Sequence, residues 1–137
     1  MDFDYELNKI SFLDGEANIE QLYDFVDRLQ ETSNKRDAVS AIFRFVEKNF
    51  DKVLGSPGPL VHFLEEENDY INELKESIAR KPTDHTVWMV NRIINAAGGK
   101  ENEFWMAKLA EIVNHPKADS EAKESAKEFI EYQREKI

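Results

Sequence analysis

Three histidines are the first residues to consider for catalysis or metal binding, because imidazole serves proteins as general base and as metal ligand. His62, His85 and His115 lie in three separate segments, and no pair has the His-Glu-x-x-His spacing of a helical zinc site. Asp84 stands beside His85, but neighbouring residues on a helix point in different directions. The sequence therefore predicts no metal site and no catalytic histidine.

Carboxylates are the other groups that could catalyse a reaction, and the chain has 28 of them. A catalytic pair needs one acid in a dry pocket that raises its pKa, and the consecutive Glu65, Glu66 and Glu67 cannot all be buried. The chain has no cysteine, no Gly-x-Ser-x-Gly turn and no Gly-x-Gly-x-x-Gly loop. We therefore expect a protein that is not an enzyme and that binds no cofactor.

The stretch from Gly55 to Leu60, GSPGPL, could be a ligand loop, a hinge or a helix boundary. Gly55 suits the left-handed end of a helix, Ser56 is a good N-cap, and Pro57 suits the first helical position. No Gly-Lys-Ser/Thr follows, so the stretch is not a phosphate-binding P-loop. We interpret it as the end of one helix and the start of the next.

The charge of the chain limits the kinds of partner that it can bind. The formal net charge is −10, from 18 basic and 28 acidic residues. Nucleic-acid binding requires a basic surface that neutralises phosphates, so we expect no nucleic-acid partner. An acidic surface attracts a basic protein instead, although many cytosolic proteins are acidic only because charge keeps them soluble.

Two acidic segments are candidate partner-binding surfaces. The first consists of Glu65, Glu66, Glu67, Asp69 and Tyr70. The second, in the acidic N-terminal third of the chain, consists of Asp14, Glu16, Glu20 and Asp24. In the first, the ring of Tyr70 would anchor a partner, although three glutamates in a row also fit an ordinary solvated loop.

Helical periodicity dominates the sequence, because apolar residues recur at spacings of three and four from residue 18 to residue 136. The breaks in this pattern predict an all-α fold of about six helices, paired as antiparallel hairpins over residues 18–50, 57–97 and 101–136. Hairpins of roughly 35 to 40 residues suit a HEAT- or armadillo-like α-α stack. No repeated motif supports that stack, so a helical bundle remains an alternative.

Particular segments of this pattern lead to further expectations. One apolar stripe consists of Ile19, Leu22, Val26 and Leu29. The helix that follows Leu60 is expected to pause at residues 65–69. Trp88 and Trp105 lie on apolar stripes, so we expect both in the core, with an interface anchor as the alternative. The pattern before residue 18 does not decide between a short helix and an arm packed on the first helix.

The composition predicts one domain over residues 1–137. The chain is 41% hydrophobic, which is enough for a core without disulfides. Its first residues are acidic, unlike the basic start of a secretory signal, and no apolar run approaches the roughly 20 residues of a membrane span. We expect a cytoplasmic monomer that binds no membrane.

The run from Leu54 to Ala96 contains the segments GSPGPLVHFLE and KPTDHTVWMVNRI. Through them it resembles small bacterial immunity proteins that accompany secreted polymorphic toxins, including toxins of contact-dependent growth inhibition. The resemblance implies an all-α fold, no enzymatic activity and a tight complex with one cognate toxin domain. It covers about a third of the chain and assigns no binding residues.

These observations together predict an immunity protein that neutralises a toxin domain, with nucleases as the favoured toxin class, through an acidic surface. The alternative is a non-enzymatic helical-repeat adaptor that binds a different basic protein. A third hypothesis is an enzyme with a cryptic carboxylate site, which would require a deep polar pocket and a raised carboxyl pKa.

Overall fold

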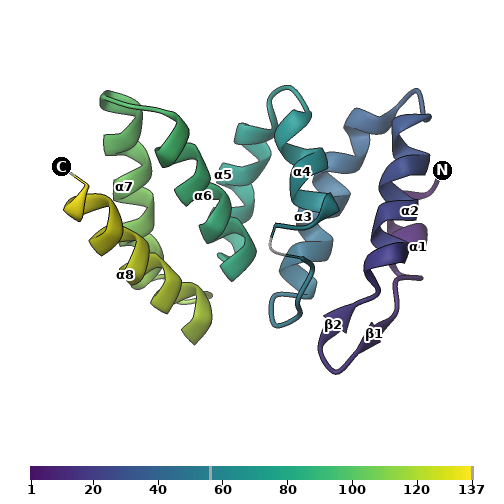
Figure 1. Ribbon diagram of the computed structural model, residues 1–137, viewed down its shortest axis with the longest axis horizontal. Helices are drawn as coiled ribbons and strands as arrows, with labels where there is room; N and C mark the ends of the chain where they lie inside the picture. Colours follow the sequence, from purple (N-terminus) through teal and green to yellow (C-terminus); the bar gives the residue numbers. More distant parts are fainter. Residues whose placement is uncertain (56, 137) are drawn as a thin grey trace. The chain divides into compact units, whose positions relative to one another are not determined.

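The computed structural model describes residues 1–55 and 57–136, and helices hold most of them (Figure 1). The described chain contains eight α-helices and a single two-stranded ribbon, which confirms the all-α class. The α-helices are α1 (Phe3–Leu7), α2 (Ile19–Gln30), α3 (Ala38–Lys48), α4 (Pro59–Glu66), α5 (Tyr70–Arg80), α6 (Asp84–Ala96), α7 (Lys100–Val113) and α8 (Ser120–Glu135). The strands are β1 (Phe12–Leu13) and β2 (Glu16–Ala17), and the 3-10 helix η1 (Lys35–Asp37) precedes α3. The HEAT-like stacking of these helices stays a prediction.

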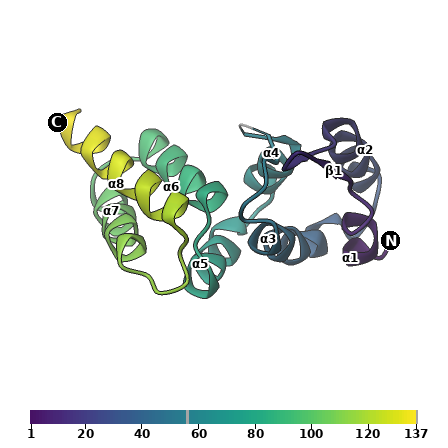
Figure 2. The same ribbon diagram turned by 90° about the horizontal axis from the view of Figure 1, so that it is seen from below.

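The chain folds as two compact units, residues 1–75 and residues 76–137, with their boundary inside α5. In the first unit, α1 packs against α3 and α2 packs against α4, as Figure 2 shows. The rings of Phe25, Phe43 and Phe63 are fully buried there. Aromatic burial on this scale stabilises a small helical core by several kcal/mol per ring, on the order of 3 to 5 on truncation to alanine.

The segment before residue 18 forms both a helix and a hairpin. Asp2 caps the short α1, and Asp14 and Gly15 then join β1 to β2 in a turn where both residues have positive φ. An Asp-Gly pair with two left-handed residues is the sequence of a type I′ turn, whose twist matches that of the flanking strands. Val53 extends the ribbon by a parallel bridge to Glu16.

The GSPGPL stretch does separate two helices, but the second begins later than the sequence predicts. Gly58 is the N-cap and Pro59 opens α4, so Pro57 is not the first helical residue, and Ser56 lies outside the described residues. Gly55 has a φ of 106°, and a Cβ on Gly58 would overlap the Leu54 carbonyl oxygen. Both glycines are therefore required by the backbone.

The predicted pause at residues 65–69 is a real helix break. Helix α4 ends at Glu66, and Asp69 takes the left-handed conformation, with a φ of 62°, immediately before α5. A non-glycine residue in this region ends helical geometry because a left-handed residue cannot continue a right-handed helix.

The second unit contains α6, α7 and α8, each packed on the other two (Figure 2). Thr83 and Thr86 form a buried capping box at the start of α6. Ala122 and Ala126 are fully buried on α8, and such small side chains let α8 approach its neighbours closely. Within the described part of the chain, every helix lacks either the length or the apolar composition that membrane crossing requires.

Candidate functional site

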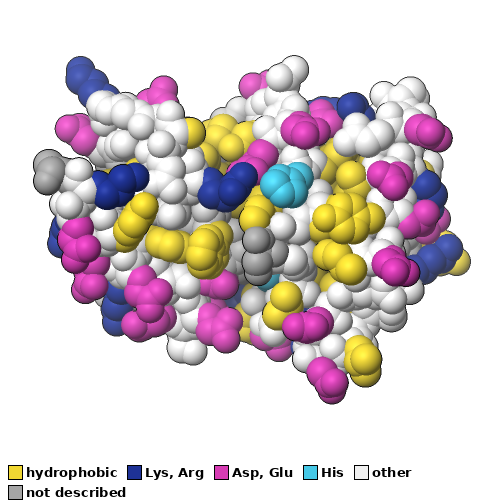
Figure 3. Space-filling view, viewed as in Figure 1, with side chains coloured by type: hydrophobic (Ala, Val, Ile, Leu, Met, Phe, Trp, Pro, Cys, Tyr) yellow, Lys and Arg dark blue, Asp and Glu magenta, His cyan; other side chains and the backbone are white. Residues whose placement is uncertain are grey.

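The outer side of α2 carries four carboxylates at helical spacing. They are Glu20, Asp24, Asp27 and Glu31, and all four are exposed. At 100° per residue these positions fall within roughly 60° of the helix circumference. We call them the acidic α2 face. Figure 3 shows acidic side chains along the part of the molecule where α2 lies.

Local contacts fix how α2 presents this face. The Asn18 side chain accepts a hydrogen bond from the Gln21 backbone N–H and so caps the helix. The Gln21 side-chain oxygen in turn accepts bonds from the Ser11 N–H at 2.7 Å and the Ser11 hydroxyl at 3.0 Å. Leu22, Phe25 and Leu29 are fully buried on the opposite side. The helix is therefore held at its start and along its inner side.

Little positive charge offsets the acidic α2 face. Arg28 is the only base on α2, and its guanidinium pairs with Asp24 at 3.0 Å and with Glu6 at 3.4 Å. Among the described residues, no ion pair involves Glu20, Asp27 or Glu31. From residue 14 to residue 31 the chain has six acids and one base, a net charge of −5. The electrostatic potential in the solvent outside this surface is therefore negative.

An exposed aromatic side chain borders the acidic α2 face. Tyr23 is 54% exposed, and Ile19, one turn before it, is 43% exposed. The sequence predicts Ile19 on the inward stripe, and that prediction is wrong, because the buried side of α2 is centred near Leu29 and leaves Ile19 at its edge. A tyrosine beside carboxylates can be buried against a partner at a small entropic cost.

The four predicted N-terminal acids lie on two consecutive elements, the β-hairpin and α2, and all four are exposed. Asp14 and Glu16 are exposed on the hairpin that leads into α2, where Glu20 and Asp24 follow. Sequence reasoning missed Asp27, Glu31 and Tyr23. The i, i+4, i+7, i+11 spacing of the four α2 acids was the signal that would have found the first two.

The predicted surface at Glu65–Tyr70 is only partly open. Glu66 and Asp69 are exposed, whereas Glu65 and Tyr70 are half-buried. The Glu67 carboxylate lies 3.7 Å from the Lys35 ammonium, and its side chain is only 12% exposed. The Lys35 ammonium therefore offsets the negative charge of Glu67, which the sequence predicts to face a partner. The role of this surface stays a prediction.

The second unit exposes two large aromatic side chains, Trp88 on α6 and Tyr132 on α8. Trp88 is 51% exposed, so its predicted place in the core is wrong, whereas Trp105 is buried as predicted. The edge of the Trp88 ring meets Phe129 at a centroid distance of 4.8 Å. The buried side of α6 is formed by its neighbours Val87 and Val90, which leaves Trp88 at the surface. Hydrophobic side chains are visible over α8 in Figure 3.

The acids and histidines of the described residues form no metal-binding cluster, and one histidine has a structural role. Among the described residues, no group of three or more acids and histidines is placed to hold a metal ion. His62 is exposed. The His115 ring accepts a bond from the Lys117 N–H at 3.0 Å and, through its other nitrogen, donates to the Ala79 carbonyl at 3.1 Å. His115 therefore holds the loop between α7 and α8 in place.

Comparison with known proteins returned no match: no protein-family model, no curated protein and no solved structure is significantly similar to this chain.

Proposed function

We propose that this chain is an immunity protein that binds a cognate bacterial toxin domain and neutralises it by covering a basic surface of the toxin. The observation that carries the proposal is the acidic α2 face, with four carboxylates on one side of a helix and an exposed tyrosine beside them. The resemblance of residues 54–96 to immunity proteins of polymorphic toxins supports the same function. Inhibition by binding requires no catalytic group and no cofactor in this chain. We place this inhibition in the cytoplasm.

The charge of this face favours a nuclease as the toxin. Nuclease clefts are basic because they bind phosphate backbones, and a row of carboxylates presents a comparable line of negative charge. Such complementarity accelerates association and suppresses partners of the wrong sign. Tyr23 would supply the buried aromatic contact that charge alone does not provide.

Co-expression with the product of the adjacent upstream gene tests the proposal. An immunity gene is expected directly beside its toxin gene, so we expect that product to stop growth alone, and this chain to restore growth and co-purify with it one to one. Two charge-reversal variants locate the surface. One changes Glu20, Asp24, Asp27 and Glu31 to lysine. The matched control changes Glu121, Glu124, Glu128 and Glu131, which are exposed on α8.

We expect the α2 variant to lose protection and the α8 variant to keep it. Absence of both toxicity and a complex would overturn the immunity proposal and favour the adaptor function. Full protection by both variants would be consistent with the immunity function but would show that the toxin binds a surface other than the acidic α2 face. Reversal of Glu65, Glu66 and Asp69 is then the next variant to measure.

A further inference from the structure

The outward side of the β-ribbon carries three exposed side chains in a row. Leu13 stands opposite Glu16 in the β1–β2 register, and Glu16 is bridged to Val53 on its other side. Residues that stand opposite each other in paired strands project from the same side of the ribbon. Leu13 is 78% exposed, Val53 is 48% exposed and Glu16 between them is also exposed. We call these three residues the hairpin row.

The inward side of the same ribbon is packed. Phe12 stacks on Phe45 at a centroid distance of 6.4 Å, and Ala17, its partner across the ribbon, is half-buried. The alternation of strand side chains thus places Phe12 and Ala17 on the core and turns the hairpin row to solvent. The most exposed large apolar side chain of the described chain, Leu13, belongs to this row.

Backbone hydrogen bonds hold the ribbon in place. The Ala17 N–H donates to the Val53 carbonyl at 2.9 Å, and the Val53 N–H donates to the Gly15 carbonyl at 2.8 Å. The Ser11 carbonyl accepts a bond from the Asn18 N–H at 2.9 Å. Because the row is ordered before any partner arrives, binding would cost little conformational entropy.

The charges around the row are mostly negative. Asp14 lies next to Leu13 in the turn, and Glu20 follows in the first turn of α2. The base nearest in sequence to Val53 is Lys52, whose ammonium lies 3.4 Å from the Asp51 carboxylate. Figure 3 shows hydrophobic and acidic side chains next to one another where the hairpin projects. The Glu16 carboxylate therefore faces solvent between Leu13 and Val53, and most of the charged residues near it in the sequence are acidic.

We infer that the hairpin row binds one arginine or lysine side chain of the partner protein. The Glu16 carboxylate would take the cationic head, and the methylene stem would lie on Leu13 and Val53, because long basic side chains pack their stems on apolar surface. This inference rests on the proposed function for the nature of the partner, a protein with a basic surface. It adds a contact outside the acidic α2 face, with one carboxylate for one cationic head.

The test is a titration of the full chain, labelled with ¹⁵N, with a tri-arginine peptide and with the uncharged tri-citrulline peptide of the same shape. We expect tri-arginine to shift the amide signals of residues 12–17 and 52–54, and tri-citrulline to leave them unchanged. Glu16→Gln should weaken the binding measured at these amides about tenfold, because a charge-assisted bond is lost. Leu13→Ser should weaken it about threefold by removing the apolar support.

Glu121→Gln is the matched control. It also replaces one exposed carboxylate by an amide, but on α8, away from the ribbon in the sequence. We expect it to change the binding less than twofold. Equal effects of Glu16→Gln and Glu121→Gln would overturn the inference, because the peptide would then respond only to net charge. Shifts confined to α2 would overturn it as well.

The co-purified toxin separates this inference from the proposed function. If the inference holds, Glu16→Gln and Leu13→Ser raise the dissociation rate of the complex while association stays fast. Toxin binding unaffected by both changes would overturn the hairpin row and leave the immunity function standing. Arginine binding at the row without any toxin complex would overturn the function and support the row as a site for another basic protein.

Discussion

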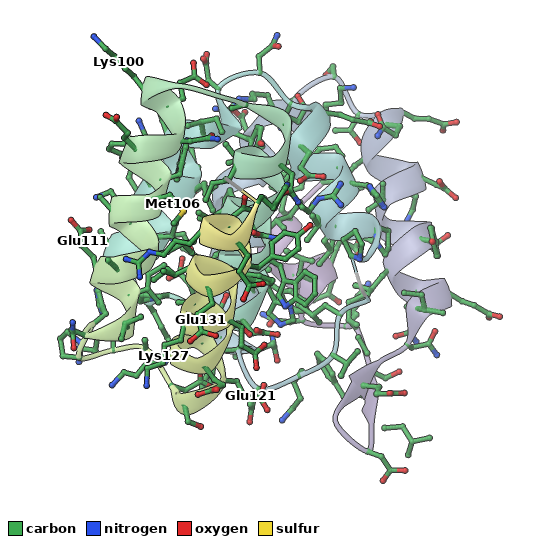
Figure 4. The ribbon with its side chains drawn as sticks, turned by 60° about the vertical axis from the view of Figure 1, so that its left-hand side comes forward. Lys100, Met106, Glu111, Glu121, Lys127 and Glu131 are labelled. Atoms are coloured by element: carbon green, nitrogen blue, oxygen red, sulfur yellow. The ribbon has the colours of Figure 1, made fainter. Side chains whose placement is uncertain are left out.

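Helices α2 and α8 both carry carboxylates at helical spacing, and they differ in the bases around them. From residue 18 to residue 31 there are four acids and the single base Arg28. From residue 120 to residue 136 there are five acids and four bases. Figure 4 shows this mixture on α8, where Glu121, Lys127 and Glu131 are labelled. The net charges of the two segments are −3 and −1.

The proposed function therefore gives the same residue type different roles on the two helices. On α8, bases stand three and four positions from several of the acids, so the fields of these opposite charges largely cancel at a distance. On α2 three of the four acids have no ion-pair partner among the described residues, so they add little to stability. Their field reaches a partner within a Debye length, about 8 Å at physiological salt. Spacing alone does not separate the two helices, and under the proposed function the local balance of charge does.

The largest expected effect separates the two faces directly. Changing Glu20, Asp24, Asp27 and Glu31 to lysine should slow association with the cognate partner about 100-fold at low salt, because steering would become repulsion. The corresponding change of Glu121, Glu124, Glu128 and Glu131 should slow it less than about threefold. Stopped-flow or surface-plasmon kinetics measure both rates. Equal slowing in the two variants would show that only net charge matters.

Polar side chains on the inner sides of α8 and α2 should differ in how much they contribute to stability. Gln133 on α8 is buried, and its amide donates to the Asn91 and Asn95 side-chain oxygens, both at 2.8 Å. Gln133→Ala should lower the free energy of unfolding by about 1 to 3 kcal/mol, because a buried acceptor loses its donor. Gln21→Ala, which removes the half-buried acceptor for Ser11, should cost about 1 kcal/mol or less. Urea denaturation measures both, and a greater loss from Gln21→Ala would contradict the difference.

The salt dependence of the association rate should also distinguish α2 from α8. Association of the native protein should slow about tenfold between low and high ionic strength, because screening shortens the reach of the acidic α2 face. The α8 variant should keep this salt dependence, and the α2 variant should show a flat or reversed one. The measurement is the slope of the association rate against ionic strength. A native protein without salt dependence would contradict a steering role for α2.

The smallest expected effect comes from the one base on α2. Arg28→Gln removes the charge that pairs with Asp24 and Glu6, so association should accelerate about twofold. Stability should change by less than about 1 kcal/mol, because exposed ion pairs contribute little. Lys123→Gln on α8 is the control and should leave the association rate unchanged. Slower association of Arg28→Gln would indicate that the guanidinium itself contacts the partner.

Much of the fold could be predicted from the sequence, because helix signals are local. The cap at Asn18 and the break at residues 65–69 follow from a few neighbouring residues. At the start of α6 the local sequence allows Thr83 or Asp84 as the cap, and the structure has Thr83. The β-ribbon could not be predicted, because strands of two residues are too short to show a periodicity. Its Asp-Gly turn was the one local signal available.

The candidate site was harder to predict, because exposure depends on contacts between distant residues. Glu67 looked like part of an open negative surface until Lys35, 32 positions earlier, proved to be its partner. Trp88 looked like a core residue because large apolar side chains are usually buried. Whether a residue at the edge of an apolar stripe is covered depends on which neighbour packs there, and a single helix does not contain that information.

The Gln133 amide also determines the register of two helices. Asn91 and Asn95 are one turn apart on α6, and the two N–H groups of one amide reach both. Alanines along α8 would tolerate a slide by a helical turn, since one small apolar side chain can replace another. A slide would leave the buried Asn91 oxygen without a donor, and that penalty makes one alignment of α6 and α8 the stable one.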